Sequence, residues 1–420
     1  MNSRQSNQRC SPVRSESPMD ADTAAVVPRR QFLSGISSCL AVIAADRWVP
    51  KRAWAQPSPG APRSMVAYVG CYTTEKRNGH GKGINVYRMD PASGHWSHVQ
   101  LVEDLVNPSF LALDRRQRFL YAVHGDMTYA TAFAIDASSG HLKPLNQQDT
   151  GGTNPVHLAV DPSNRFLVVS NYSSGSVAVL PIHADGSLAP LSDVVELQGK
   201  PGPHPSQQTR SHPHHNPFDP SGRFLLVPDK GLDKIFVFRL DTAKGKLVPA
   251  AFPDVATQAG AGPRHVDFHP SLPYVYAINE LDSTVATYRY DAAHGELKPL
   301  QVVSTLPSDF TGDNTTAEIA VAPSGTFVYG SNRGHDSIVI YSVDPSRGLL
   351  TPVGWQPTEG KTPRYFGLDP SGTLLYAGNQ DSDTVITFRI DQTTGKLTPT
   401  GQVVQTGSPV TIVFNPMTPT

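Results

Sequence analysis

Three features of common protein classes are scarce in this 420-residue sequence: cysteine, an excess of charge of one sign, and long apolar runs. The 35 basic and 36 acidic residues leave a formal net charge of −1, which gives no indication of nucleic acid or an anionic membrane as a partner. No apolar run reaches the roughly 18 residues that a membrane-spanning helix needs. Glycine and proline, by contrast, number 34 and 38, so we predict a soluble protein rich in turns.

The beginning of the chain differs from the rest. The twin arginine Arg29-Arg30 precedes the short apolar stretch 35–45, and small residues lead up to Ala55, where a signal peptidase would cleave. This pattern predicts a Tat-type export signal over residues 1–55 and a periplasmic or secreted mature protein. A tail with a chance pair of arginines is the alternative.

Removal of this signal would leave a single cysteine. Cys10 and Cys39 lie within the signal and Cys71 follows it, so the mature chain cannot form an internal disulfide. We predict a linker over residues 56–64 and one repeat domain over residues 65–420, which we expect to be a monomer.

One unit recurs along this domain, with Asp-Pro-Ser in its first half and Gly-x-Leu-x-Pro at its end in most copies. Each copy holds four short β-rich runs separated by turn residues, with almost no helical periodicity. Six complete copies begin at Pro108, Pro155, Pro213, Pro263, Thr316 and Pro363. A single four-stranded sheet cannot bury both faces, whereas repeated sheets around an axis pack on one another as a β-propeller. The Gly-His and Trp-Asp signatures of WD40 blades and the paired glycine of kelch blades are absent.

A seventh copy is divided between the two ends of the domain. It begins at Pro409 and stops after one strand, while its remaining strands lie at residues 65–70 and 83–88 and in the turn region that follows. We therefore predict an all-β, seven-bladed propeller with four antiparallel strands per blade. The C-terminal strand closes the ring by joining the N-terminal blade.

Comparison of the repeats distinguishes structural residues from candidate functional residues. A residue that most blades share at one position is expected to stabilise the blade. The start of strand one and the end of strand two share a rim of the channel. Proline opens six of seven blades and fixes the entering turn. Two further shared positions are the histidine column, for which we expect structural hydrogen bonds, and an asparagine position, for which we expect turn capping. They comprise His157, His215 and His265, and Asn171, Asn279, Asn332 and Asn379.

Two other columns vary between blades. The inner column, which follows the opening proline, reads Ser109, Val156, His214, Arg264, Ala317, Arg364 and Val410. The rim column, which follows the asparagine position, reads Gly125, Tyr172, Lys230, Glu280, Arg333 and Gln380. Glu280, Arg264 and Arg333, with His212 and His214 of the preceding blade, would face one another across adjacent blades. Solvated rim charge explains any one of them alone, but the group together predicts a functional site.

This group suits the opening of a cyclic ester. Lactone hydrolysis needs a base that activates water and positive charge near the developing oxyanion. Glu280 or His212 would be the base, and Arg264 and Arg333 would polarise the carbonyl or pair with a phosphate or carboxylate. The scheme requires no metal.

Other chemistries find less support. The histidines at 212, 214 and 215 are dense enough for a metal site, but they lack the HExxH spacing and a carboxylate among them. There is no Gly-x-Ser-x-Gly elbow, and Cys71 lacks a paired histidine, so a covalent nucleophile is poorly supported. The loop 199–211 is long for a connection between blades; a plain flexible loop is favoured over a substrate lid.

Specific motifs resemble the propeller-type lactonase family over residues 65–416. They are His212-Pro-His, Gly262-Pro-Arg-His, Asn279-Glu and Ser331-Asn-Arg-Gly-His-Asp-Ser-Ile. That family includes bacterial 6-phosphogluconolactonase and the fungal carboxymuconate lactonising enzyme. The resemblance implies a seven-bladed propeller, no cofactor, a small-molecule lactone substrate, and catalytic residues at His212, Arg264, Glu280 and Arg333. We expect substrate contacts from Tyr172, Lys230, His214, His265 and His335.

Three functions therefore follow from the sequence. The leading hypothesis is metal-independent hydrolysis of a sugar lactone of the gluconolactone or 6-phosphogluconolactone type. Because phosphorylated sugar lactones are cytoplasmic, the export signal favours an unphosphorylated or carboxylated lactone. The alternatives are a carboxymuconate cycloisomerase and a non-catalytic propeller that binds a component of the cell envelope.

Overall fold

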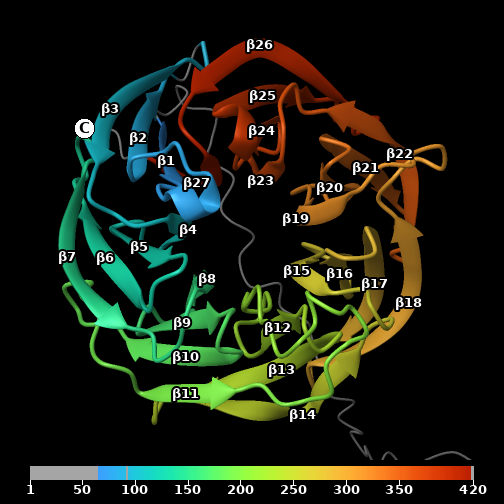
Figure 1. Cartoon of the computed structure of the whole chain (residues 1–420), viewed down its shortest axis with the longest axis horizontal. Coiled ribbons are helices and arrows are strands. Elements are labelled where there is room, and N and C mark those ends of the chain that lie inside the picture. The colour runs from blue at the N-terminus through green and yellow to red at the C-terminus, as the bar shows by residue number, and fades with distance from the viewer. Residues whose placement is uncertain (1–64, 91–92, 418–420) are drawn as a thin grey trace, which may run out of the picture. The chain divides into compact units, whose positions relative to one another are not determined.

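The computed structural model describes residues 65–90 and 93–417. The predicted export signal (1–55) and linker (56–64) lie outside the described residues. Within the described part, seven antiparallel sheets are arranged radially around a central axis, as Figure 1 shows. The repeat domain is therefore the predicted seven-bladed propeller.

The strands of each blade follow one another from the axis outward. The blade that joins both ends consists of β27 (Pro409–Pro416), β1 (Met65–Cys71), β2 (Ile84–Met89) and β3 (Trp96–Val102). The next two consist of β4 (Pro108–Leu113), β5 (Phe119–His124), β6 (Tyr129–Ile135) and β7 (Leu142–Asp149), and of β8 (Pro155–Val160), β9 (Phe166–Asn171), β10 (Ser176–Pro181) and β11 (Asp193–Glu196). The fourth sheet holds β12 (Leu225–Asp229), β13 (Lys234–Asp241) and β14 (Lys246–Ala256).

The remaining three blades are regular. They consist of β15 (Pro263–Phe268), β16 (Tyr274–Asn279), β17 (Thr284–Asp291) and β18 (Glu296–Ser304); of β19 (Thr315–Val321), β20 (Phe327–Arg333), β21 (Ser337–Val343) and β22 (Leu350–Pro357); and of β23 (Pro363–Leu368), β24 (Leu374–Asn379), β25 (Thr384–Ile390) and β26 (Leu397–Gln405). Two short 3-10 helices, η1 (Glu75–Arg77) and η2 (Gln380–Ser382), lie in connections at the rim.

The ring closes as the sequence predicts. β1 pairs antiparallel with β27, from Met65 opposite Pro416 to Cys71 opposite Pro409. Strands from the two ends of the chain thereby share one sheet.

One blade departs from the four-strand prediction. Its inner segment forms only two isolated bridges, Pro213 with Asp229 and Phe218 with Leu225, rather than a continuous strand. Regular strands in other blades also begin with proline, but only this segment has a second proline inside it, Pro217, which carries no backbone N–H for regular pairing with β12. This irregular backbone carries the histidines at 212, 214 and 215.

The hydrophobic core lies between neighbouring sheets. Fully buried Ile278 on β16, for example, belongs to one cluster with Val328 on β20 and Tyr341 on β21. Apolar side chains that alternate along each strand therefore fill the space between blades, as expected for radially packed sheets.

Tyrosine hydroxyl groups also connect neighbouring blades. Each donates to a glycine carbonyl in the Gly-x-Leu turn of the next blade: Tyr68 to Gly140, Tyr121 to Gly186, Tyr276 to Gly348 and Tyr329 to Gly395, at 2.8 to 3.0 Å. At Gly186 the backbone has a φ of 87° and an added Cβ would lie 2.2 Å from the Phe119 ring. Glycine recurs here because both the conformation and the close approach exclude a side chain.

The shared asparagines are structural, with a longer reach than expected. The side-chain amides of Asn171, Asn332 and Asn379 donate to the carbonyls of Thr150, Thr305 and Thr358. Each carbonyl belongs to the chain leaving the preceding blade. The same amides also donate to the serine or threonine hydroxyl five residues on, and Asn279 does so too, so these asparagines span their own turns and three of them join blades as well.

Among the residues that the structure describes, no helix has the length and apolar character needed to cross a membrane.

Candidate active site

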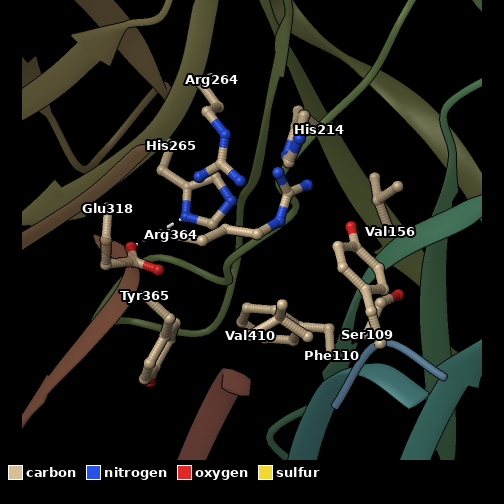
Figure 2. A pocket seen from close by; sticks show the side chains of 11 residues that line it. Ser109, Phe110, Val156, His214, Arg264, His265, Glu318, Arg364, Tyr365 and Val410 are labelled. Atoms are coloured by element: carbon tan, nitrogen blue, oxygen red, sulfur yellow. Dashed lines mark hydrogen bonds and ion pairs between the residues drawn. The ribbon is translucent and has the colours of Figure 1, made fainter. Parts of the chain in front are cut away.

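A pocket opens at one mouth of the central channel, where the inner strands of the blades begin. It is lined by Tyr72, Ser109, Phe110, Val156, His214, Arg264, His265, Glu318, Arg364, Tyr365 and Val410. Figure 2 shows side chains from several blades around this space. Six of the seven inner-column residues line it, so that column does converge on the channel mouth as its position in the repeat predicts.

Glu280 lies among three cations beside this pocket. Its Oε1 is 3.0 Å from Lys230 Nζ, and its Oε2 is 3.1 Å from Arg264 Nε and 3.4 Å from Arg333 Nη2. The four side chains are between 4% and 13% exposed. Burial raises the pKa of Glu280, but Lys230, Arg333 and Arg264 together outweigh it and hold the pKa well below its usual range. Glu280 is therefore an ionised carboxylate at neutral pH.

The two arginines are oriented by backbone carbonyls at the start of β19. Arg264 Nη1 donates to the carbonyl of Ala317 and Arg333 Nη2 to that of Thr316, both at 2.6 Å. These carbonyls are available because the pairing of β19 with β20 shifts register between Thr316 and Ile319. Both guanidinium groups are thus fixed in place, while their buried Nε–H groups make no hydrogen bond within the described part of the chain.

His212 lies at the same mouth in a defined tautomer. Its Nδ1 is 2.9 Å from the carbonyl oxygen of Tyr172. A carbonyl only accepts, so Nδ1 carries the hydrogen and Nε2 carries the lone pair. The Tyr172 ring stacks on the imidazole, with 4.4 Å between ring centroids. Burial lowers the pKa of His212, so the ring is neutral at neutral pH and Nε2 is a base.

The loop 199–211 takes part in the site. Lys230 Nζ is 3.0 Å from the side-chain oxygen of Gln207 and lies 5.2 Å from the centroid of the Tyr172 ring. The buried side-chain amide of Gln208 donates to the Lys230 carbonyl and to Asp233, at 2.8 and 2.7 Å. The loop is therefore anchored next to the catalytic candidates, contrary to the expectation of a plain flexible connection.

The pocket wall carries polar atoms with no partner in the described protein. They are Ser109 Oγ, His214 Nδ1 and His265 Nε2, all buried. A buried polar atom left without a hydrogen bond destabilises a protein, so such atoms at one site indicate a polar ligand or water. His214 and His265 therefore lie where substrate contacts were predicted.

In the histidine column His157 and His265 are buried and His215 is half-buried, which agrees with the expected structural role. His157 Nδ1 contacts Asn216 Oδ1, and His215 Nδ1 accepts the backbone N–H of Val266 at 3.3 Å. The rings of His215 and His265 stack at 4.2 Å. Only His265 of the three also lines the pocket.

His335 lies apart from the pocket residues. Its Nδ1 is 2.6 Å from Ser337 Oγ, its backbone N–H donates to Asn314, and its ring contacts Phe310. The structure therefore places it in the turn after β20, and a substrate contact from it stays a prediction.

Among the pocket residues that were not predicted as site residues, Arg364, Tyr72 and Glu318 have functional groups that could act on a substrate. Arg364 belongs to the inner column, and its guanidinium lies 5.3 Å from the Tyr72 ring centroid. Tyr72 is the seventh member of the rim column. It was not assigned to that column from the sequence because its blade is divided between the two ends of the chain. Glu318 is the acidic residue at the position of the histidine column, and this departure was the signal that could have identified it.

Within residues 65–90 and 93–417, no group of three or more histidine, cysteine or acidic side chains could hold a metal ion. Cys71 is buried at the end of β1, and burial raises the pKa of its thiol to about 12.

Comparison with known proteins agrees with this architecture. The model of the family described as lactonase, 7-bladed beta-propeller matches residues 66–414. The 6-phosphogluconolactonase of Bacillus subtilis is 37% identical over 307 residues, which cover 72% of this chain and 85% of that protein. The corresponding protein of Formosa agariphila is 35% identical, with coverage of 72% and 86%.

Solved structures agree as well. A putative 6-phosphogluconolactonase from Bacteroides fragilis has a TM-score of 0.78 at 33% identity, covering 86% of this chain and all of that one. The periplasmic gluconolactonase of Pseudomonas aeruginosa also has a TM-score of 0.78 at 33% identity, covering 84% of this chain and all of its own. With the family model spanning nearly all described residues, this chain belongs to the lactonase family of seven-bladed β-propellers.

Proposed function

We propose that the protein is an esterase that hydrolyses a sugar lactone to the open acid, without a metal ion. The observation that carries this proposal is the juxtaposition at one mouth of a neutral histidine with a free Nε2 and two oriented arginines. A base for water and positive charge for an oxyanion are the two requirements of ester hydrolysis. The lactonase names of the relatives support the same reaction.

His212 is the better candidate for the base. A carboxylate surrounded by Lys230, Arg264 and Arg333 binds a proton weakly, so Glu280 is poorly suited to remove one from water. The Nε2 of His212 is unprotonated at neutral pH and makes no hydrogen bond within the described residues. In this scheme His212 accepts the proton of the attacking water, and Glu280 holds the cations in place.

Arg264 and Arg333 stabilise the tetrahedral oxyanion. Each guanidinium has one N–H committed to a carbonyl of β19, so the group does not need to reorganise when negative charge develops. Glu280 sets their positions from the other side through its ion pairs. The preorganised positive charge therefore faces the lactone carbonyl before reaction.

The charge of the mouth favours a lactone with an anionic group. Lys230, Arg264, Arg333 and Arg364 gather there, and Glu280 neutralises only part of their charge. Arginine binds carboxylate and phosphate groups through paired N–H donors. A carboxylated or phosphorylated lactone would therefore gain affinity from the residual positive charge.

The cellular location of the protein bears on whether its substrate is phosphorylated or carboxylated. The twin arginine at 29–30 supports export, and one structural relative is named a periplasmic gluconolactonase. We propose a periplasmic or secreted enzyme, in which case an unphosphorylated sugar acid lactone is the substrate available to it.

A panel of lactones tests the function. Purified mature protein is mixed with δ-gluconolactone, its 6-phosphate and a carboxylated lactone, and acid release is followed with a pH indicator against the spontaneous rate. Acceleration that survives a chelator supports the proposal. No acceleration with any lactone would reject it, and loss of the diene absorbance of a carboxymuconate would instead identify a cycloisomerase.

A further inference from the structure

Glu318 is an acidic side chain on the pocket wall that the scheme above does not use. It lies on β19 and is 9% exposed. Its carboxyl group faces the ring of His265, while Arg364 extends across the same space, as Figure 2 shows. Its position in the pocket brings it within reach of a bound substrate rather than leaving it in the scaffold.

The two oxygens of this carboxyl group differ. Oε1 lies 2.8 Å from His265 Nδ1 and accepts the backbone N–H of Ile319 at 3.1 Å. Oε2 makes no hydrogen bond within the described residues. Because the Ile319 N–H can only donate, Oε1 is the accepting oxygen, and we assign the acid proton to Oε2.

The surroundings of Glu318 keep it uncharged. Burial raises the pKa of Glu318 to about 8, against the smaller opposing effects of Arg264 and Arg364. Asp267 on β15 raises the pKa further, and buried Tyr365 on β23 faces Glu318 without a charge.

Arg264 explains the contrast with Glu280. Its Nε is 3.1 Å from Glu280 and its Nη1 donates to the Ala317 carbonyl, whereas Glu318 makes no ion pair with an arginine within the described residues, so the effect of Arg264 on Glu318 does not offset burial. Two carboxyl groups that interact with one arginine thus have opposite protonation states. Such a pair, one ionised and one neutral, is a common basis for separate acid and base roles in one site.

We infer that Glu318 is the catalytic acid. The Oε2–H group of Glu318 protonates the ring oxygen as the lactone opens. This inference rests on the proposed lactone hydrolysis. An alkoxide is a poor leaving group, so cleavage of the bond between the acyl carbon and the ring oxygen requires a proton donor.

The steps balance. Water loses a proton to His212 Nε2 as its oxygen bonds to the acyl carbon, and the carbonyl electron pair moves to oxygen. As that pair returns, the ring C–O bond breaks and the ring oxygen takes the Glu318 proton. The product is a hydroxy acid, and the proton on His212 returns to Glu318 through solvent, which restores both groups.

The test uses the oxygen lactone and its sulfur analogue. Glu318→Gln keeps the shape and the Oε1 acceptor but has no transferable proton. With δ-gluconolactone we expect kcat to fall by roughly 10²- to 10⁴-fold. With the corresponding thiolactone, whose thiolate leaves without a proton, we expect a loss of less than about tenfold. Glu196→Gln on exposed β11 is the matched control and retains both activities.

The wild-type protein provides a measurement that needs no variant. Its rate with δ-gluconolactone should decline above an apparent pKa near 8, as Glu318 loses its proton, and the decline should be absent with the thiolactone. Equal losses on both substrates in Glu318→Gln, or an alkaline decline common to both, would overturn the inference. Failure of wild-type protein to hydrolyse any lactone would instead reject the proposed function.

Discussion

The backbone carbonyl of Tyr172 receives the Nδ1–H of His212 at 2.9 Å, while the ring of the same tyrosine stacks on the imidazole. The carbonyl fixes the tautomer and the ring fixes the plane. These two contacts can be separated by mutation, because only the second depends on the side chain.

Two replacements of Tyr172 therefore distinguish the contribution of its stacked ring from that of its hydroxyl group. Tyr172→Phe keeps the stack and should retain kcat, whereas Tyr172→Ala should lower kcat by roughly tenfold or more, because the base loses its orientation. His212→Ala should lower kcat by roughly 10²- to 10⁴-fold. Steady-state kinetics with δ-gluconolactone would check all three, and wild-type rates in His212→Ala would remove the histidine from the mechanism.

The acid side of the pH profile reports on the same histidine. Burial lowers the pKa of His212 below the ordinary histidine value of 6.5. A base works only when unprotonated, so kcat/KM should decline in acid with an apparent pKa below 6.5. An acid limb that persists unchanged in His212→Gln would assign the base to another group.

Glu280→Gln should destabilise the fold as well as reduce activity. The change leaves three buried cations without their carboxylate, which typically costs about 3 to 5 kcal/mol. Urea unfolding at pH 7 would measure it, with Glu103→Gln at an exposed position as the control. Unchanged stability would show that the cations are not held by Glu280.

The pH dependence of this effect has a definite sign. The pKa of Glu280 is depressed in the fold relative to the ordinary glutamate value of 4.5, so its contribution to stability is present above about pH 4.5 and lost as pH falls through the folded pKa. The stability difference between wild type and Glu280→Gln should therefore shrink in acid. A difference that grows as pH falls would contradict the depressed pKa.

Arg364→Gln should change substrate preference. A hydrogen bond to a charged group contributes about 1.5 to 3 kcal/mol, so kcat/KM for a carboxylated or phosphorylated lactone should fall by roughly 10- to 100-fold. The value for neutral δ-gluconolactone should change little. Arg389→Gln on β25 serves as a control, and an equal loss on both substrates would mean that Arg364 does not bind the anionic group.

Export can be tested through the signal. Changing Arg29 and Arg30 together to lysine should retain the protein in the cytoplasm, because the twin-arginine route requires both arginines. Cell fractionation followed by immunoblotting measures the distribution. Unaltered export would assign secretion to another route.

Comparison of blades predicted much of the candidate site, because reactive residues differ from those that the other blades have at the same repeat position. Glu280, Arg264 and Arg333 were identifiable as departures from their columns. Their ion pairs confirm that they lie together, and the ring closure followed from the divided seventh copy.

The remainder needed three-dimensional information. Glu318 was not predicted because its repeat position holds histidine in three other blades, and a position shared in that way indicates a structural role. The interruption of the inner strand near Pro217 depends on which backbone N–H groups the pairing with β12 requires. The choice between His212 and Glu280 as base depends on which cations surround the carboxylate, and spacing in the sequence does not give these contacts.

The pairing of β1 with β27 also governs when this protein can finish folding. Residues about 350 apart along the chain must meet, so the ring closes only after the ribosome has released nearly the whole domain. Until then β1 presents an unpaired edge, the kind of surface that promotes aggregation. Loss of β27 alone would therefore leave a permanently open ring, because β1 would then keep its unpaired edge.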